Sequence, residues 1–197
     1  MHSGYRFLGI AVLCLAVPMQ AAKAQMSAWT PEDSTRLLDP PAAFPQLPSA
    51  ARRDLQRRGC RIPRASGPDV SASQQARPNN VLAGAFLGPG QHNWAVLCSI
   101  ADTSRILIYA GARSAHVDSV ARIPDGGFLW QERGSARGFY RELGTATPHL
   151  IRRLARAAGD HAPPTVDHLG VNDYFAGKAS TIYYFRRGRW LEFPGWD

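Results

Sequence analysis

Long apolar runs, lysines and cysteines are scarce in this sequence, and each shortage excludes something. The apolar run Phe7–Val17 has about half of the ~20 residues that a membrane-spanning helix needs, so we predict no retained transmembrane span. Lys178 is the only lysine beyond residue 24, so arginine carries nearly all of the positive charge there. No basic run alternates with stacking aromatic residues, which argues against a nucleic-acid partner.

Familiar catalytic motifs are also missing. The sequence GSARG at residues 134–138 has its serine in the wrong position for a Gly-x-Ser-x-Gly nucleophile turn. There is no His-Glu-x-x-His zinc motif, and Gly88-Pro89-Gly90 is not followed by the Gly-Lys-Ser/Thr of a phosphate-binding loop. These absences disfavour the corresponding classes of enzyme, and we predict no cofactor.

The first 24 residues have the pattern of a secretory signal peptide. Arg6 precedes the apolar run, and Ala22-Lys23-Ala24 supplies the small-x-small pattern found before a cleavage point. We therefore expect cleavage after Ala24 and a periplasmic or secreted protein. Lipid attachment at Cys14 is disfavoured because Leu13 stands where a small residue is needed.

Two cysteines, Cys60 and Cys98, remain after this cleavage, in a compartment where thiols are oxidised. We expect them to form a disulfide. Alternation along WAVLCSI puts Cys98 on the same strand face as Trp94, Val96 and Ile100, which suits a buried bridge. The alternative, a nucleophilic cysteine, requires a free thiolate and a partner base.

The distribution of proline predicts one domain that follows a linker. Residues 25–48 are small and polar and hold five prolines, a composition that favours an extended linker: Pro31, Pro40, Pro41, Pro45 and Pro48. Residues 49–197 are numerous enough to bury one core. We predict that they form a single α+β domain with an antiparallel sheet of five to seven strands, two short helices and one disulfide.

Capping residues and apolar patterns locate the elements of this domain. The first helix is expected from a capping Ser49 to Arg58, and the second from Thr147-Pro148 to Ala158. The apolar runs VLAGAFL, WAVLCSI and RILIYA predict an antiparallel meander, and TIYYF and RWLEF predict a closing hairpin. Three further strands are candidates between residues 112 and 146: His116–Ile123, Phe128–Glu132 and Phe139–Leu143.

Arginine is concentrated in the two predicted helices. Residues 52–64 hold six arginines against a single acid, Asp54. Removal of Arg6 and Lys23 with the signal peptide lowers the formal net charge from +8 to +6. A solvated helix surface is the commoner explanation of such a pattern, and contact with an anionic envelope polymer or a protein partner is the functional one. The candidate anion contacts are Arg52, Arg53, Arg57, Arg58, Arg152, Arg153 and Arg156.

Acid–base and metal-binding candidates lie in two short segments. His116-x-Asp118 and Asp167-His168 each place a base near an orienting acid. Residues 167–173 resemble a calcium loop of the form Asp-x-Asp-Gly-x-x-Asp in which Leu169 replaces the middle acid, leaving Asp167, Asn172 and Asp173 as weak ligands. The acid–base candidates of a hydrolase are therefore His116, Asp118, Asp167, His168 and Asp173.

Residues Gly84–Val96, GAFLGPGQHNWAV, resemble one unit of the calcium-binding FG-GAP, or integrin-type, repeats. In that family acidic side chains of the turn bind Ca²⁺ through oxygen atoms. The corresponding positions here are Ala85, Leu87, Pro89 and Asn93, and only Asn93 has a side-chain oxygen. The resemblance therefore implies a loop that keeps its turn without an ion, and a single unit does not imply a propeller.

A broader resemblance covers most of residues 49–197. Cys60-Arg61-Ile62-Pro63, the NVLAGAF turn, WAVLCS, and KAS ahead of the aromatic hairpin are similar to a family of short, uncharacterised exported bacterial proteins. That resemblance implies no particular activity. We expect a non-catalytic binding or structural protein of the cell envelope. The alternative is a hydrolase that uses the region Asp167–Asp173, with or without a divalent ion.

Overall fold

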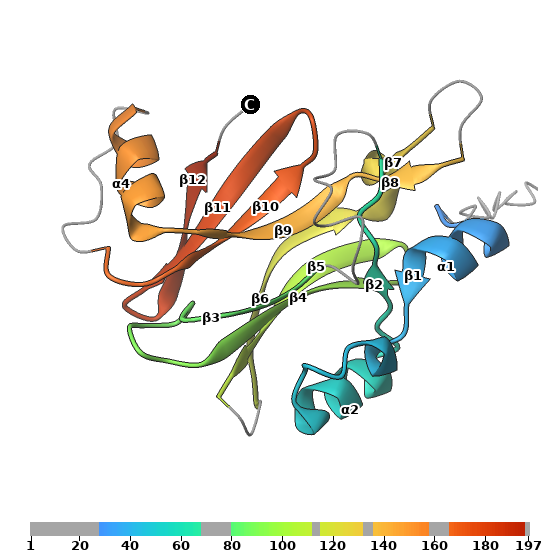
Figure 1. Ribbon diagram of the computed structural model, residues 1–197, viewed down its shortest axis with the longest axis horizontal. Helices are drawn as coiled ribbons and strands as arrows, with labels where there is room; N and C mark the ends of the chain where they lie inside the picture. The colour runs from blue at the N-terminus through green and yellow to red at the C-terminus, as the bar shows by residue number, and fades with distance from the viewer. Residues whose placement is uncertain (1–27, 68–79, 112–114, 132–135, 158–165, 196–197) are drawn as a thin grey trace, which may run out of the picture.

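Figure 1 presents a computed structural model that describes residues 28–67, 80–111, 115–131, 136–157 and 166–195. Within these residues there are three α-helices and twelve strands, which form four antiparallel sheets. The mixed α+β class is confirmed. The number of strands is larger than the expected five to seven, and the number of α-helices is larger than the expected two. None of the helices in the described part of the chain has the length and apolar character needed to cross a membrane. The predicted signal peptide lies outside the described residues.

The first large sheet is the predicted meander. Its order is β3-β4-β5-β6, with strands β3 (Val81–Gly84), β4 (Asn93–Ile100), β5 (Thr103–Ala110) and β6 (Ala115–Pro124). Ala101 and Asp102 form the turn between β4 and β5 with φ of 47° and 58°, both in the left-handed region. Two such residues make a two-residue turn that matches the twist of a hairpin. The break between the strands is thus two residues long, whereas the predicted runs WAVLCSI and RILIYA leave four residues, 101–104, between them.

The second large sheet contains the predicted aromatic hairpin. Its order is β12-β11-β10-β9, with strands β9 (Arg141–Ala146), β10 (Gly170–Phe175), β11 (Ala179–Arg186) and β12 (Arg189–Pro194). Arg187 and Gly188 turn the hairpin with φ of 49° and 79°. Helix α4 (Pro148–Ala157) follows β9 and begins as predicted, because the Thr147 hydroxyl accepts a hydrogen bond of 3.2 Å from the Leu150 amide. Ala158, the expected last residue of this helix, lies outside the described residues.

Both faces of both large sheets are covered, in the order α2, first sheet, second sheet, α4 (Figure 1). The core between the sheets includes Leu97 and Ile108 from the first and Val171 and Tyr183 from the second. The opposite face of the first sheet packs against Ala51 and Leu55 of α2 (Ser49–Arg57) and contains Val96, Cys98, Leu107 and Tyr109. The predicted alternation along β4 is therefore confirmed.

Residues 28–48 are not an extended linker. They form α1 (Pro31–Leu37), β1 (Leu38–Asp39) and the short 3₁₀ helix η1 (Pro41–Ala43). Their apolar side chains Leu37 and Phe44 are 1% and 0% exposed. The prolines do not oppose this structure, because Pro31 and Pro41 stand at the start of a helix, where an absent N–H costs no intrahelical bond. Strand β1 pairs with β2 (Ile62–Pro63).

Helix α2 ends at Arg57, one residue before the expected Arg58, and it does not begin as predicted. Pro48 occupies the capping position and no side chain caps the helix, so the expected Ser49 cap is wrong. At the other end Gly59 adopts φ 69°. The amides of Gly59 and Cys60 donate to the carbonyls of Gln56 and Leu55, at 3.0 and 2.9 Å. These two bonds form a Schellman motif, which satisfies the last carbonyls of the helix.

The predicted disulfide is present. Cys60 and Cys98 are bonded, with their Cα atoms 5.5 Å apart. Both residues are buried in the core beneath α2. The bridge therefore attaches the end of α2 to strand β4, and neither sulfur is a free nucleophile.

The middle of the chain is divided more finely than its apolar pattern indicates. The predicted strand His116–Ile123 lies within β6, and the described part of Phe128–Glu132 contributes only β7 (Leu129–Trp130). Before β7 the short helix η2 (Asp125–Phe128) turns the chain. The predicted strand Phe139–Leu143 is interrupted at Tyr140, with β8 (Gly138–Phe139) paired to β7 and β9 joining the second large sheet.

Candidate functional site

A buried ion pair lies between the two large sheets. Arg141 of β9 is 0% exposed and holds Asp173 of β10 through two bonds of 2.8 Å, Nε to Oδ1 and Nη2 to Oδ2. Its remaining donors reach the first sheet, where Nη1 donates to Ser104 Oγ at 2.7 Å and Nη2 to the Ala121 carbonyl at 2.7 Å. The guanidinium also stacks 4.9 Å from the centre of the Phe128 ring. Both oxygens of Asp173 are therefore occupied by Arg141.

A cavity of about 200 Å³ opens beside this ion pair. Its walls are mainly apolar and include Ile123, Phe128 and Phe175, with Asp173 and Thr181 as polar members. Since the Asp173 carboxylate already accepts two charge-assisted hydrogen bonds from Arg141, it is a poor general base in this position. The cavity therefore offers shape and apolar surface with little chemistry.

Asp167 and His168 form a second cluster, on the other side of the second sheet. His168 Nδ1 lies 2.7 Å from Asp167 Oδ1, and Nε2 lies 2.9 Å from the Phe185 carbonyl, which can only accept a hydrogen bond. The imidazole also stacks on Tyr184 at 4.4 Å. The side-chain contact with His168 holds the pKa of the Asp167 carboxyl below its usual value. Because protein atoms occupy both ring nitrogens, His168 has no free nitrogen for proton transfer.

The structure does not bring the predicted metal ligands Asp167, Asn172 and Asp173 together. Alternate residues of β10 face opposite sides of the sheet, so Asp173 points toward the first sheet and Asn172 toward the α4 side. Asp167 contacts Tyr184 on the α4 side. Among the described residues no group of three or more His, Cys, Asp or Glu side chains is placed to hold a metal ion.

The remaining acid–base candidates lie on β6. Asp118 Oδ2 accepts a hydrogen bond of 2.9 Å from Trp190 Nε1 of β12, so this carboxylate links the two large sheets. The side chain of His116 lies outside the described part of the structure. Asp118 therefore shares no contact with the Asp167–His168 cluster in the described structure, and each of these acids has its own structural partner.

Asn93 closes the loop that resembles an FG-GAP unit. It is 1% exposed, and its Oδ1 accepts hydrogen bonds from the amides of Phe86 and Leu87 at 2.9 and 3.0 Å. Of the four positions where FG-GAP units have calcium ligands, only Asn93 has a side-chain oxygen, and that oxygen binds backbone amides of the loop. That no calcium binds to this loop stays a prediction.

The arginines around α2 fall into two groups. Arg57 and Arg58 pair with Asp54 at 3.0 and 2.6 Å, and Tyr109 also donates to Asp54 at 2.9 Å. Burial raises the pKa of the Asp54 carboxyl, but the hydrogen bonds from Arg58 and Tyr109 and the two positive charges lower it overall. Arg64 pairs with Asp39, and Arg61 donates to the Leu38 carbonyl.

Arg52 and Arg53 form the second group. Within the described residues neither has an acidic partner. They border a depression of about 200 Å³ together with Ala42, Ser49 and Gln56. Arg52 Nε is buried there without a described hydrogen-bond acceptor. In the described structure, the guanidinium groups of Arg52 and Arg53 are therefore available to a partner at this depression.

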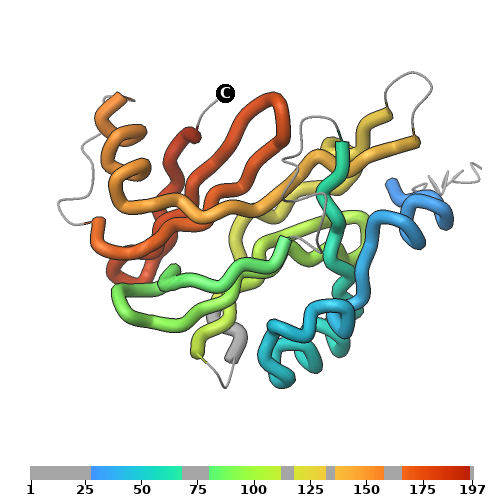
Figure 2. Tube along the Cα trace, in the orientation of Figure 1, coloured from blue at the N-terminus to red at the C-terminus, as the bar shows by residue number. Residues whose placement is uncertain are grey.

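The candidate arginines of α4 do not extend this surface. Arg152 donates to the Val166 carbonyl at 2.9 Å, and Arg156 Nε donates to the Arg152 carbonyl at 3.2 Å. Helices α2 and α4 lie at opposite ends of the molecule, as both traces show (Figures 1 and 2). The seven predicted anion contacts thus belong to two separate surfaces.

The sequence reasoning missed a polar row on the α4 side of the second sheet. Glu142 and Ser180 flank Tyr174 in the strand register, and Asn172 lies on the same face one pair away. Glu142 Oε2, Asn172 Oδ1 and Ser180 Oγ are buried without a hydrogen-bond partner among the described residues. Burial raises the pKa values of Glu142 and Tyr174. The alternation Asn172-x-Tyr174 was the available signal, since two polar residues on one face interrupt an apolar strand pattern.

Comparison of the chain with models of known protein families, with curated proteins and with solved structures finds no match. The resemblance to an FG-GAP unit and to exported bacterial proteins therefore stays a prediction from the residues. A function for this chain has to be inferred from its own contacts, cavities and charges.

Proposed function

We propose that this is an exported, non-catalytic binding protein that contacts an anionic polymer of the cell envelope through Arg52 and Arg53 of α2. One observation carries the proposal. Asp54, the only acid of α2, pairs with Arg57 and Arg58, so within the described residues the charges of Arg52 and Arg53 stay uncompensated beside a depression. A carboxylate or sulfate group seated there would accept hydrogen bonds from both guanidinium groups.

Two further features support this assignment. A buried N–H without an acceptor is costly, and an anionic oxygen at the depression would satisfy Arg52 Nε. The helix is also a rigid support, because Leu55 is buried and the disulfide at Cys60 attaches its end to β4. A rigid backbone at the binding site reduces the conformational entropy that is lost when a partner arrives.

The contacts of the acid–base candidates support a binding role over a catalytic one. Asp173 is held by Arg141, Asp118 by Trp190, and His168 by Asp167 and the Phe185 carbonyl. The hydrolase alternative at residues 167–173 gains no supporting contact among the described residues, since its two carboxylates face opposite sides of a sheet. We therefore propose binding as the function.

Retention of residues 25–197 on immobilised heparin tests this proposal. The protein is expected to bind at low salt and to elute as salt is raised, because charge pairs at a surface are screened. The variant Arg52→Ala/Arg53→Ala is expected to elute at clearly lower salt. The matched control Arg152→Ala/Arg156→Ala removes the same charge from α4 and is expected to lose much less retention.

Two results would overturn the proposal. If the protein is not retained at low salt, no anionic polymer of this kind binds. If the two double variants elute together, retention reflects only net charge. Circular dichroism of each variant shows that its fold is intact before the columns are compared.

A further inference from the structure

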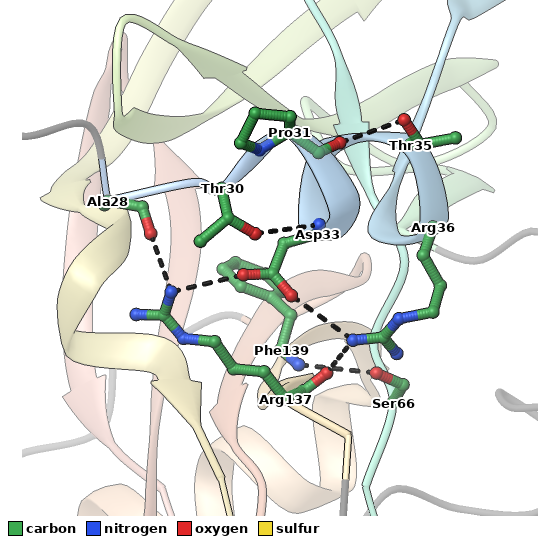
Figure 3. Close-up of polar contacts among 9 residues, drawn as sticks. All are labelled: Ala28, Thr30, Pro31, Asp33, Thr35, Arg36, Ser66, Arg137 and Phe139. Atoms are coloured by element: carbon green, nitrogen blue, oxygen red, sulfur yellow. Dashed lines mark hydrogen bonds and ion pairs between the residues drawn. The ribbon is translucent and has the colours of Figure 1, made fainter.

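A polar cavity of about 430 Å³ lies between α1 and three residues next to β7 and β8, namely Gln131, Ala136 and Arg137. Its volume falls within the range of about 300–1,000 Å³ that is usual for small-molecule sites. Two of the residues that line it, Asp33 and Arg36, come from α1, and Arg137 comes from just before β8 (Figure 3). The cavity shares no lining residue with the depression on α2, so a ligand bound here is independent of the anionic polymer proposed for that helix.

One buried carboxylate organises the cavity. The Asp33 side chain is 6% exposed, with Arg36 Nη2 at 3.4 Å from Oδ1 and Arg137 Nη1 at 3.2 Å from Oδ2. Arg137 Nη1 also donates to the Ala28 carbonyl at 3.1 Å, and Arg36 Nη2 donates to the Arg137 carbonyl (Figure 3). Burial raises the pKa of the Asp33 carboxyl, but the bonds with Thr30 and Arg137 and the arginine charges lower it overall.

The two guanidinium groups keep hydrogen-bonding capacity. Each has five N–H donors, and the described contacts use only Nη2 of Arg36 and Nη1 of Arg137. Their side chains are 38% and 32% exposed, so solvent or a ligand can reach them. One Asp33 carboxylate does not neutralise two guanidinium groups, so this wall of the cavity carries net positive charge and suits a carboxylate.

Glu32 supplies the opposite charge at the same cavity. It lines the cavity, its side chain is exposed, and it has no described ion-pair partner. Among the described lining residues, two acids balance two arginines, which disfavours a multiply charged anion such as phosphate. A ligand with one carboxylate and one ammonium group would match both charges without leaving either unpaired.

We propose that this cavity binds a small zwitterion of the amino-acid class, with its carboxylate on Arg36 and Arg137 and its ammonium group at Glu32. Thr30, Gln131 and four charged residues make up most of the described wall. This lining suits a polar ligand, since pockets for hydrophobic ligands are lined mainly by apolar side chains. The site is held in shape by Asp33, which fixes both arginines before a ligand arrives.

Saturation-transfer NMR of residues 25–197 with each standard L-amino acid tests the proposal. At least one amino acid is expected to receive saturation from the protein. Its carboxamide derivative, which lacks the negative charge, is expected to receive none, and inorganic phosphate is expected not to displace the amino acid. Arg137→Gln is expected to abolish the signal, and the control Arg152→Gln on α4 is expected to retain it.

Glu32→Gln keeps the test decisive if Arg137→Gln does not fold. Because Glu32 is exposed and makes no described contact that holds α1, this variant is expected to melt at the native temperature while its signal for the amino acid falls severalfold. The proposal is overturned if no amino acid binds, if phosphate displaces the amino acid, or if a folded Arg137→Gln or Glu32→Gln variant binds as the native protein does.

Discussion

At the scale of single residues, Glu142 is held in a position that opposes its ionisation. Its Oε2 atom is buried on the α4 side of β9 without a described hydrogen-bond partner. Burial raises its pKa above the ordinary value of 4.5, because the charged carboxylate loses hydration there. The folded protein therefore binds this proton more tightly than the unfolded chain does.

Glu142→Gln is expected to raise the free energy of unfolding at pH 7. Native stability falls as pH rises from 4.5 through the raised pKa, since ionisation then favours the unfolded chain. The increase in the free energy of unfolding should therefore be greatest at neutral pH. It should vanish below pH 4.5, where the native protein and the variant both carry an uncharged side chain at position 142. Urea unfolding between about pH 4 and pH 8 measures it. Equal gains for Glu192→Gln, an exposed carboxyl on β12, would contradict the burial argument.

At the scale of secondary-structure elements, capping residues at helix ends predicted the helices better than local composition did. Thr147-Pro148 correctly predicted the start of α4. Thr30-Pro31 is the same signal, and the Thr30 hydroxyl accepts a hydrogen bond of 3.1 Å from the Asp33 amide at the start of α1. The proline content of residues 25–48 outweighed that signal in the prediction, although proline is well tolerated in the first turn of a helix.

Gly59→Ala is expected to lower the free energy of unfolding by about 1 kcal/mol, because an L side chain is strained in the left-handed conformation. A Cβ atom at this position would meet no atom within 4 Å, so the cost is one of backbone conformation and not of collision. Gly127→Ala in η2 is the matched control, since its Cβ would also meet open space and its φ is not positive. Equal effects in urea unfolding would disprove the role of Gly59.

At the scale of the whole molecule, a few polar side chains tie the two large sheets together. Arg141 and Asp173 belong to the second sheet, and Arg141 donates to Ser104 and Ala121 of the first. Trp190 and Asp118 make a second link between the sheets. Buried polar contacts of this kind are geometrically demanding, so they fix how one sheet lies on the other.

Asp173→Asn is expected to lower the free energy of unfolding by about 3 kcal/mol or more, because it leaves a buried guanidinium without its counter-charge. Asp39→Asn removes the partner of the half-exposed Arg64 and should cost under about 1 kcal/mol. Urea unfolding of both variants measures the difference. A further variant, Arg141→Met/Asp173→Leu, should recover much of the loss, since neither charge of the pair then remains. Equal costs for the two single variants would contradict the importance of burial.

The candidate sites were only partly accessible to sequence reasoning. The arginine concentration in α2 was visible, and the spacing of Arg57 and Arg58 from Asp54 is the i+3 and i+4 spacing at which helix side chains meet. The pair between Arg64 and Asp39 was not visible in the same way, because Asp39 lies 25 positions away in another segment. The cavity at Asp33 was missed, because it joins α1 to residues about 100 positions away.

Local sequence signals correctly predicted the two hairpins, the end of α2 to within one residue, the start of α4, the alternation of β4 and the Cys60–Cys98 pairing. Turns, caps and alternation depend on neighbours a few residues apart, and only two cysteines follow the predicted signal peptide, which leaves one pairing within the chain. Long-range packing was needed to show that residues 28–48 join the core, that Arg141 bridges two sheets and that the candidate arginines divide between two surfaces. Those outcomes depend on contacts between distant segments, which become favourable only when packing removes both partners from water.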